Sequence, residues 1–150
     1  MIRLTRTLLS VAALTSATSL AAAVDPVKSR IQAYRELGAA FKNVNDELRK
    51  PKPQPMILQI SAREIRAVAQ QQHGFFPAGS GPRPGVKTAA RAEIWRQPAQ
   101  FKAAQDAFTA QANAFARVAG TGDVAKMRAG AKALGATCAG CHKSFRVEKD

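Results

Sequence analysis

The chain has 150 residues, enough for one ordinary domain, and its 23 Lys and Arg against 10 Asp and Glu give a formal net charge of +13. A charge of this sign is compatible with nucleic-acid binding, but the basic residues are scattered and only 6% of the residues are aromatic, so we exclude that class. The charge instead favours attraction to an acidic protein partner or to an anionic membrane surface.

The first 23 residues predict a secretory signal peptide. Arg3 and Arg6 precede an apolar stretch from Leu8 to Leu20, and small Ala residues follow up to Ala23. The alternative is an uncleaved membrane anchor, but the stretch is too short and too rich in Ser and Thr for a good membrane span. We therefore expect cleavage after Ala23, export to the periplasm, and a mature domain over residues 24–150 that has no integral membrane span.

Two helices are predicted in the first half of that domain. The first begins at the N-cap Asp25, with Pro26 at the first helical position, and ends at the prolines Pro51, Pro53 and Pro55. Its apolar stripe consists of Val27, Ile31, Tyr34, Gly38, Phe41 and Leu48. The second helix is shorter, and a capping box over residues 61–64 indicates its start. Its apolar positions, up to about His73, are Ile57, Ile60, Ile65 and Val68.

A loop and two further helices are predicted in the second half. Four Gly and three Pro between residues 74 and 88 exclude regular structure there. The third helix starts near Pro98, ends at Gly120-Thr121-Gly122, and buries Phe101, Phe108, Phe115 and Val118. The fourth starts at Asp123, and its apolar stripe is Val124, Met127, Ala131, Leu134, Cys138, Cys141 and Phe145. Because no segment alternates with the period of a strand, we predict an all-α fold, an antiparallel four-helix bundle.

The fourth predicted helix carries the motif Cys-Ala-Gly-Cys-His over residues 138–142. A Cys-x-x-Cys-His run is the attachment signature of a c-type haem. Cys138 and Cys141 would each form a thioether to the haem, and His142 would be an axial ligand of the iron. The alternatives are a disulfide or redox pair, which should open a helix after a strand, and half of a zinc site, which needs a second pair of ligands. We predict one covalent haem c, and expect His73 to be a surface histidine.

Several other segments accompany this motif. They are the loop Phe75-Phe76-Pro77-Ala78-Gly79-Ser80-Gly81, Glu93-Ile94-Trp95, Phe101, the helix start Gly122-Asp123, and the Lys143-Ser144-Phe145-Arg146 run. With them, essentially the whole mature chain resembles the cytochrome c′ family. The resemblance implies a four-helix bundle whose iron is typically five-coordinate, with a histidine on one side and a packed apolar residue on the other. It also implies a homodimer through the first two helices. Relatives that place a Met on the side of the iron opposite the histidine are six-coordinate electron carriers.

The resemblance also indicates which residue faces the iron from the side opposite the histidine. The family pattern, an Arg followed four positions later by the distal residue and then by a Gly, fits Arg30, Tyr34 and Gly38. A rival register uses Arg35 and Ala39. We favour the first register because Tyr34 lies on the apolar stripe. Tyr34 then covers the iron and offers its hydroxyl to a bound gas or water. The alternatives are ligation of the iron by the phenolate, which needs a strongly lowered pKa, and a core tyrosine that only fills space.

Two arginines have expected roles beside the haem. Arg30 is expected to pair with a haem propionate, and the alternative is a solvated charge on the polar face of the helix. Arg146, one turn after His142, matches the family's basic residue beside the axial imidazole, on the proximal side; the alternative is a helix-end residue that serves the dipole and solvent. The phenylalanines are expected to form core or pocket walls, and Trp95 is expected to anchor the long loop by packing.

Neither Met56 nor Met127 lies on the first helix, which disfavours a Met as sixth ligand. We therefore expect a periplasmic c-type cytochrome that transfers single electrons to or from a redox partner, which the positive charge predicts to be acidic. The alternative is a gas-binding module that sequesters or senses nitric oxide or carbon monoxide. We do not expect an enzyme, because catalysis at the haem would need a distal acid–base pair.

Overall fold

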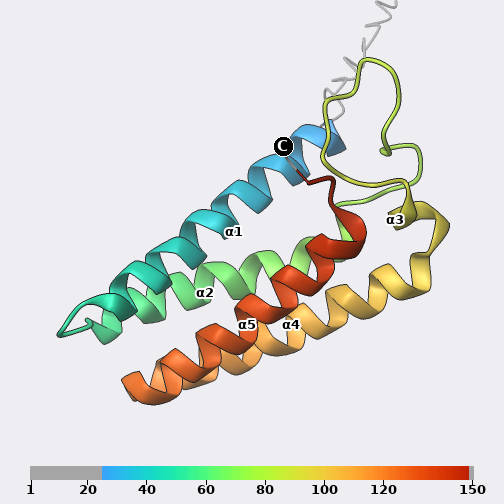
Figure 1. Cartoon of the computed structure of the whole chain (residues 1–150). Helices are drawn as coiled ribbons and strands as arrows, with labels where there is room; N and C mark the ends of the chain where they lie inside the picture. Colours follow the sequence, from blue (N-terminus) through green and yellow to red (C-terminus); the bar gives the residue numbers. More distant parts are fainter. Residues whose placement is uncertain (1–24, 149–150) are drawn as a thin grey trace, which may run out of the picture.

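Four long helices form an antiparallel bundle in the computed structural model, which describes residues 25–148 (Figure 1). They are α1 (Pro26–Arg49), α2 (Pro55–Gln71), α4 (Pro98–Thr121) and α5 (Val124–Phe145). Helix α1 packs mainly on α2, α2 on α4, and α4 on α5. The predicted all-α bundle is confirmed, whereas the predicted signal peptide lies outside the described residues.

The helix ends follow the capping residues of the sequence. The carboxylate of Asp25 accepts a hydrogen bond from the backbone N–H of Val27 at 2.9 Å, and Asp123 caps α5 by accepting from the N–H of Lys126 at 3.0 Å. Gly122, which ends α4, has φ +76°, in the left-handed region that glycine enters without a steric penalty. The predicted starts of α1 and α5 and the predicted end of α4 are therefore confirmed.

The predicted start of the second helix is wrong. Helix α2 begins at Pro55, so the predicted cap Ser61 is buried inside the helix and its partner Glu64 is exposed. A proline suits the first position of a helix, because its missing N–H would have no helical partner there. Pro55 therefore opens α2, and only Pro51 and Pro53 belong to the turn after α1. With this register Ile60 is 44% exposed.

The buried face of α1 differs in part from the predicted stripe. Gly38 is exposed and Ile31 is only partly buried, whereas Leu37, Ala40 and Val44 are buried. The predicted stripe follows one line along the helix, but α1 contacts both α2 and α5 and so needs a wider apolar face. Leu37, Ala40 and Val44, which the predicted stripe did not include, belong to the main core of the bundle.

The hydrophobic core has two parts. The main cluster fills the bundle, and its largest fully buried side chains are Val44, Leu58, Ile65, Phe115, Met127 and Leu134. Each such side chain stabilises the fold by about 1.5–3 kcal/mol relative to full exposure. A second cluster lies where α5 ends, and its buried members are Ile94, Phe101 and Phe145. The two clusters supply the frame on which the Cys-x-x-Cys-His motif is held.

A long connection joins α2 to α4. It contains the 3₁₀ turn η1 (Gln72–Gly74), a loop without helix over residues 75–92, and the short helix α3 (Glu93–Arg96), which the sequence did not predict. Trp95 anchors this loop: its indole N–H donates to the backbone oxygen of Pro77 at 3.2 Å. A Cβ placed on Gly81 would lie 3.3 Å from the indole ring, so the backbone approaches the ring closely there. The predicted packing role of Trp95 is confirmed.

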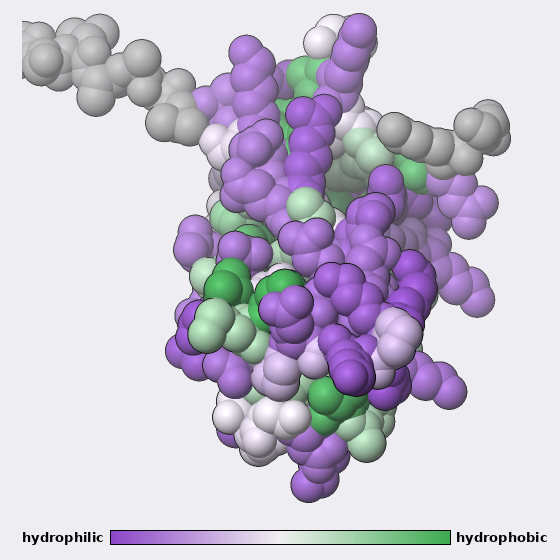
Figure 2. Space-filling model, turned by 90° about the vertical axis from the view of Figure 1, so that its left-hand side faces the viewer, coloured by the Kyte–Doolittle hydropathy of each residue, from purple (hydrophilic) through white to green (hydrophobic). Residues whose placement is uncertain are grey.

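The surface of the bundle is mostly polar. Figure 2 shows a face that is largely hydrophilic, with small and separate apolar patches. Among the described residues the exposed large apolar side chains are Met56, Ile60 and Val147. None of the helices in the described part of the chain is long and apolar enough to cross a membrane.

Candidate functional site

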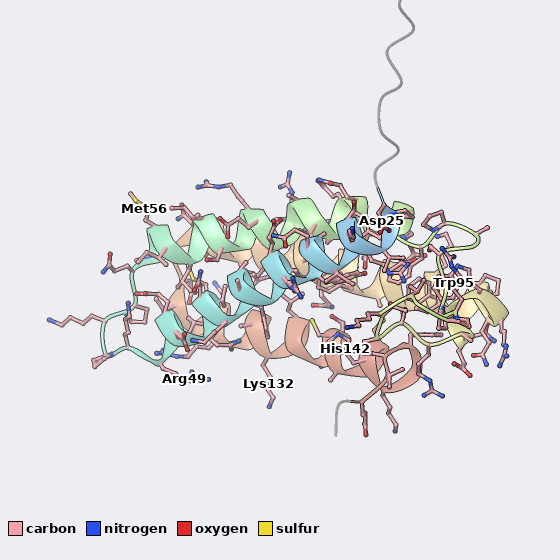
Figure 3. All side chains as sticks on the ribbon, turned by 90° about the horizontal axis from the view of Figure 1, so that it is seen from above. Asp25, Arg49, Met56, Trp95, Lys132 and His142 are labelled. Atoms are coloured by element: carbon pink, nitrogen blue, oxygen red, sulfur yellow. The ribbon has the colours of Figure 1, made fainter. Side chains whose placement is uncertain are left out.

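The Cys-x-x-Cys-His motif occupies the last turns of α5. Cys138 and Cys141 are free thiols and both are partly buried. Cys138 packs against the main core cluster and Cys141 against the second cluster, so the two sulfurs face the inner side of the helix. His142 is exposed, and Figure 3 shows it in the half of the bundle that also carries Asp25 and Trp95. Each helical residue is turned by about 100° from the one before, so His142 lies on the flank of the apolar stripe that carries Cys138 and Cys141.

The electrostatic surroundings keep the three groups of the motif neutral. Burial raises the pKa of both thiols, and the neighbouring Cys138 raises the pKa of Cys141 further. Loss of water lowers the pKa of His142 below its ordinary value of 6.5, and the positive charge of Arg146 lowers it further. At neutral pH the imidazole is therefore uncharged, which is the form that binds a metal.

Arg146 is the C-cap residue of α5, and its side chain is exposed. Its positive charge lowers the pKa of His142 in addition to the larger effect of burial. Its position is equally that of a basic residue at a helix C-terminus, where a cation interacts favourably with the helix dipole. The role of Arg146 on the proximal side of a haem stays a prediction.

Tyr34 lies on the inner side of α1, between the motif and the long connection. Its ring contacts the rings of Phe75 and Phe76, with centroid distances of 5.8 and 6.1 Å. Burial raises the pKa of its phenol, the nearby thiols Cys141 and Cys138 raise it further, and the charge of Arg30 opposes this increase. Tyr34 is therefore a neutral phenol within electrostatic reach of both cysteines.

The structure separates the two registers that the sequence left open. Arg35 and Ala39 of the rival register are both exposed. Arg30 is buried and Tyr34 is partly buried, on the side of α1 that faces the core. Only the first register therefore points inward, but the distal role of Tyr34 stays a prediction.

Arg30 holds the long loop against the start of α1. The residue is 3% exposed, and its guanidinium donates to the hydroxyl of Ser80 at 2.8 Å, to the backbone oxygen of Ser80 at 2.7 Å and to the hydroxyl of Thr88 at 3.0 Å. It also lies over the rings of Phe76 and Trp95, at 5.1 and 5.6 Å from their centroids. The alternative of a solvated Arg30 is therefore wrong. Three of the five guanidinium N–H groups are used in these bonds, so the contact with a propionate stays a prediction.

The alternatives to haem attachment find little support at the motif. Within residues 25–148, His, Cys, Asp and Glu side chains do not gather in a group of three or more that would hold a metal ion. His73 is partly exposed and pairs with Asp106 at 2.9 Å, as expected of a surface histidine. A reactive redox cysteine needs a lowered pKa, whereas the pKa values of Cys138 and Cys141 are raised.

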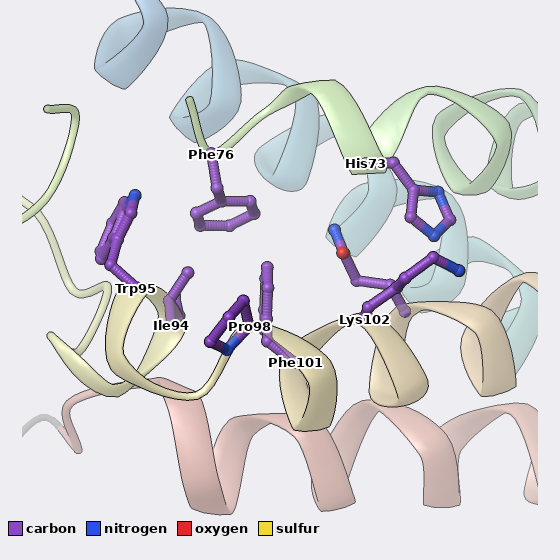
Figure 4. Close-up of a pocket in the computed structure, with 8 residues that line it drawn as sticks. His73, Phe76, Ile94, Trp95, Pro98, Phe101 and Lys102 are labelled. Atoms are coloured by element: carbon purple, nitrogen blue, oxygen red, sulfur yellow. The ribbon is translucent and has the colours of Figure 1, made fainter. Parts of the chain in front are cut away.

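A pocket of about 390 Å³ opens beside the second cluster. Figure 4 shows Phe76 and Phe101 facing each other in its wall, with His73 and Lys102 at the other end. The centroids of these two rings are 4.8 Å apart, and the ring centroid of Phe101 lies 5.1 Å from that of Phe145. Phe101, Phe108 and Phe115 are buried in the two clusters, so their predicted place in the core is confirmed, while a role as walls of a haem pocket stays a prediction.

Comparison with known proteins decides the family. The model of the family described as Cytochrome C′ matches residues 25–146. The chain belongs to the cytochrome c′ family. It is 33% identical to the cytochrome c′ of Pararhodospirillum photometricum over 121 residues, which cover 80% of this chain and 94% of that protein. It is also 32% identical to the cytochrome c′ of Rhodospirillum rubrum over 143 residues, which cover 93% of this chain and 95% of that protein.

Solved structures of cytochrome c′ share the fold. One is a nitric oxide complex of a mutant cytochrome c prime from Alcaligenes xylosoxidans, with 26% identity, a TM-score of 0.75, and coverage of 83% of this chain and 95% of that chain. The cytochrome c′ of Rubrivivax gelatinosus has 25% identity and a TM-score of 0.75, and covers 81% of this chain and 94% of that chain.

The cytochrome c′ family carries one covalent haem c, and the residues of this chain fit that group. The two partly buried thiols on the inner side of α5 suit attachment to an apolar macrocycle, and the neutral imidazole beside them suits an axial ligand. Cys138, Cys141 and His142 are therefore the residues that would hold the haem.

Some residues of this cytochrome c′ site were not predicted from the sequence. Gln72 and Gln105 are buried and bonded to each other, while Ser80 and Thr88 hold Arg30. One feature of the sequence could have indicated that Gln72 is buried. It follows Leu58 and Ile65 at a spacing of seven residues, which places this polar residue on an apolar helix face. No feature of the sequence indicated that Ser80 and Thr88 contact Arg30, because both lie in an irregular loop.

Proposed function

We propose that this protein is a periplasmic electron carrier whose iron is held on one side by His142. When bound, haem c supplies one-electron exchange between the ferric and ferrous states of iron. Cys138 and Cys141 fix the group to α5, so that it stays bound in both redox states. The exposure of His142 supports this function most directly, because a haem held by this residue would lie at a part of the bundle that a partner can approach.

The outer face of α5 fits an acidic partner. From Val124 to Phe145 the helix contains no Asp or Glu, and the exposed side chains Lys126, Lys132 and Lys143 lie along it. Lys132 projects away from the bundle (Figure 3). Complementary charge of this kind mainly speeds the encounter of two proteins and is screened by salt.

The rate of oxidation of the ferrous protein by ferricyanide, an anion, tests this function. We expect Lys132→Glu to slow the reaction and to weaken its dependence on ionic strength. Lys52→Glu is the control, because Lys52 is exposed in the turn between α1 and α2. Equal effects of the two substitutions would place the site of electron exchange elsewhere.

Gas binding is the second function that we propose, because neither of the two methionines among residues 25–148 lies near His142. Tyr34, the residue proposed for the distal side, is held as a neutral phenol by its raised pKa. Met127 is buried in the main core, fifteen helical residues before His142, a separation of about 22 Å. Met56 is exposed near the end of the bundle opposite His142 (Figure 3). A five-coordinate iron would accept a diatomic gas, and a relative from Alcaligenes xylosoxidans has been solved as a nitric oxide complex.

Replacement of the distal residue tests the second function. Tyr34→Ala should speed the association of carbon monoxide with the ferrous protein, because the ring no longer obstructs the approach. Arg35→Ala, a substitution of the next and exposed residue, is the matched control. An unchanged association rate in Tyr34→Ala would remove Tyr34 from the distal side.

A further inference from the structure

We propose that Gln72 is a positioning residue for Tyr34: it takes the phenol hydrogen and leaves only the oxygen lone pair for the distal side of the haem. The inference rests on the proposed distal place of Tyr34 and adds what that residue offers to a ligand. A gas ligand would then meet a hydrogen-bond acceptor, and would receive no hydrogen bond from Tyr34.

The direction of the hydrogen bonds around Gln72 is fixed by groups that have a single role. The amide nitrogen of Gln72 lies 2.9 Å from the backbone oxygen of Gln105, which can only accept, so this end of the amide is the NH₂ group. The same nitrogen lies 3.0 Å from the hydroxyl of Thr109, which itself donates to the backbone oxygen of Ala69 at 3.0 Å. The hydroxyl hydrogen of Thr109 is therefore used, and Thr109 accepts from Gln72.

The other end of the Gln72 amide must then be its oxygen. This oxygen lies 3.4 Å from the phenol oxygen of Tyr34, and an amide oxygen can only accept a hydrogen bond. Tyr34 is thus the donor in this contact. The hydrogen bond is long, but the amide that accepts it cannot turn over without breaking two shorter bonds.

The amide of Gln72 is also held firmly in place. Its side chain is 3% exposed, and the amide nitrogen of Gln105 donates back to the backbone oxygen of Gln72 at 2.9 Å. A buried network in which every member has its partner is rigid, because breaking one bond leaves a polar group without compensation. Gln72 therefore presents an acceptor to Tyr34 at a fixed position.

The consequence concerns the side of Tyr34 that faces the cysteines. Tyr34 and Cys138 both pack against the main core cluster, which brings this side of the ring toward the inner face of α5. With its hydrogen directed to Gln72, the phenol oxygen presents only acceptor lone pairs to that side. It can accept from a water molecule in the distal pocket, but to donate to a gas it would first have to give up its bond to Gln72.

Ultraviolet resonance Raman spectra of the haem-loaded protein test the position of the hydrogen, because Tyr34 is the single tyrosine of the chain. The tyrosine doublet reports whether the phenol donates or accepts. We expect a donor in the wild type and a loss of donor character in Gln72→Met. Gln32→Met is the control: it removes the amide of an exposed glutamine on α1 that bonds to Glu36 and not to Tyr34, and should leave the doublet unchanged. A wild-type spectrum without donor character would overturn the proposal.

The C–O stretching frequency of the carbon monoxide complex tests the consequence. A hydrogen bond to the ligand oxygen weakens the C–O bond and lowers this frequency. We expect the frequency of the wild type to be no lower than that of Tyr34→Phe. In Gln72→Met the freed hydroxyl should lower it, and Tyr34→Phe/Gln72→Met should abolish that shift. A wild-type frequency below that of Tyr34→Phe would overturn the proposal, also if Gln72→Met fails to fold.

The two measurements separate this inference from the proposed function. If carbon monoxide does not bind, the gas-binding function fails, while the Raman doublet still decides whether Gln72 takes the hydrogen of Tyr34. If carbon monoxide binds and the doublet shows no donor, the gas-binding function stands and the role of Gln72 is refuted.

Discussion

The guanidinium of Arg30 donates to both the hydroxyl and the backbone oxygen of Ser80, although fifty residues separate the two in the sequence. These bonds tie the irregular connection between α2 and α4 to the first turns of α1. The planar guanidinium suits this task, because it holds several donors in a fixed fork and stacks on aromatic rings. The loop that carries Phe75 and Phe76 to Tyr34 is thereby fixed in place.

Arg30→Lys should loosen this loop. Lysine keeps the charge but cannot reach Ser80 and Thr88 with a fork of donors, so we expect the free energy of unfolding to fall by about 2 kcal/mol, the scale of a lost hydrogen bond to a charged group. Denaturant unfolding measures this change, and proteolysis within residues 75–92 should become faster. Arg35→Lys on the exposed side of α1 is the control. Equal stability of the two variants would show that Arg30 does not hold the loop.

Removal of both thiols should abolish covalent haem attachment. In Cys138→Ala/Cys141→Ala the group can be held only by His142 and by packing, so acid-acetone extraction should remove it. In the wild type the colour should stay with the protein. Ser144→Ala, a substitution of an exposed residue in the same turns, is the control. Retention of haem by the double variant would contradict attachment through Cys138 and Cys141.

Glu47 should make the stability depend on pH. Its carboxylate accepts from the ammonium of Lys50 and, at 2.8 Å, from the backbone N–H of Gln54, and these bonds lower its pKa below the ordinary value of 4.5. A carboxyl with a lowered folded pKa stabilises the protein above its unfolded pKa, and this contribution is lost as the pH falls through the folded pKa. Glu47→Gln should therefore be less stable than the wild type at pH 7, and the difference should shrink below pH 4.5.

Thermal unfolding at a series of pH values measures this effect. Glu64→Gln is the matched control, because Glu64 is exposed on α2 and is not engaged in the turn between α1 and α2. A difference between wild type and Glu47→Gln that stays constant down to acid pH would refute the account of the carboxylate.

Two glycines near the end of α4 should respond in opposite directions to alanine. Gly122 has φ +76°, so Gly122→Ala should lower the free energy of unfolding by about 1 kcal/mol. Gly120 lies inside the helix, with open space where a Cβ would be, so Gly120→Ala should raise it by roughly 0.5 kcal/mol. Chemical denaturation of the two variants checks the signs. A stabilising Gly122→Ala would contradict the left-handed end of α4.

Local signals predicted much of the fold. Asp25, Asp123 and Gly122 each act within one helical turn, and the structure has all three in the expected roles. The capping box at Ser61 failed because the same pattern also fits the interior of a helix. Pro55 was the stronger signal for the start of α2, since proline is favoured at the first position of a helix.

The site could be predicted only in part, for a physical reason. Cys138, Cys141 and His142 are neighbours in sequence, so their spacing alone identifies the motif. The buried state of Arg30 depends on residues 80 and 88, and no periodic pattern relates a helix to an irregular loop. The hydrogen bond between Tyr34 and Gln72 likewise joins α1 to the turn η1, and only the packing of α1 on α2 brings the two residues together.

The most direct test of the account is the optical spectrum of the purified ferrous protein before and after addition of carbon monoxide. We expect a high-spin spectrum that changes on addition of the gas, because in the proposed site His142 holds one side of the iron and the neutral phenol of Tyr34 leaves the other side open. Sharp low-spin bands that do not respond to carbon monoxide would show a sixth ligand from the protein and would contradict the open distal side.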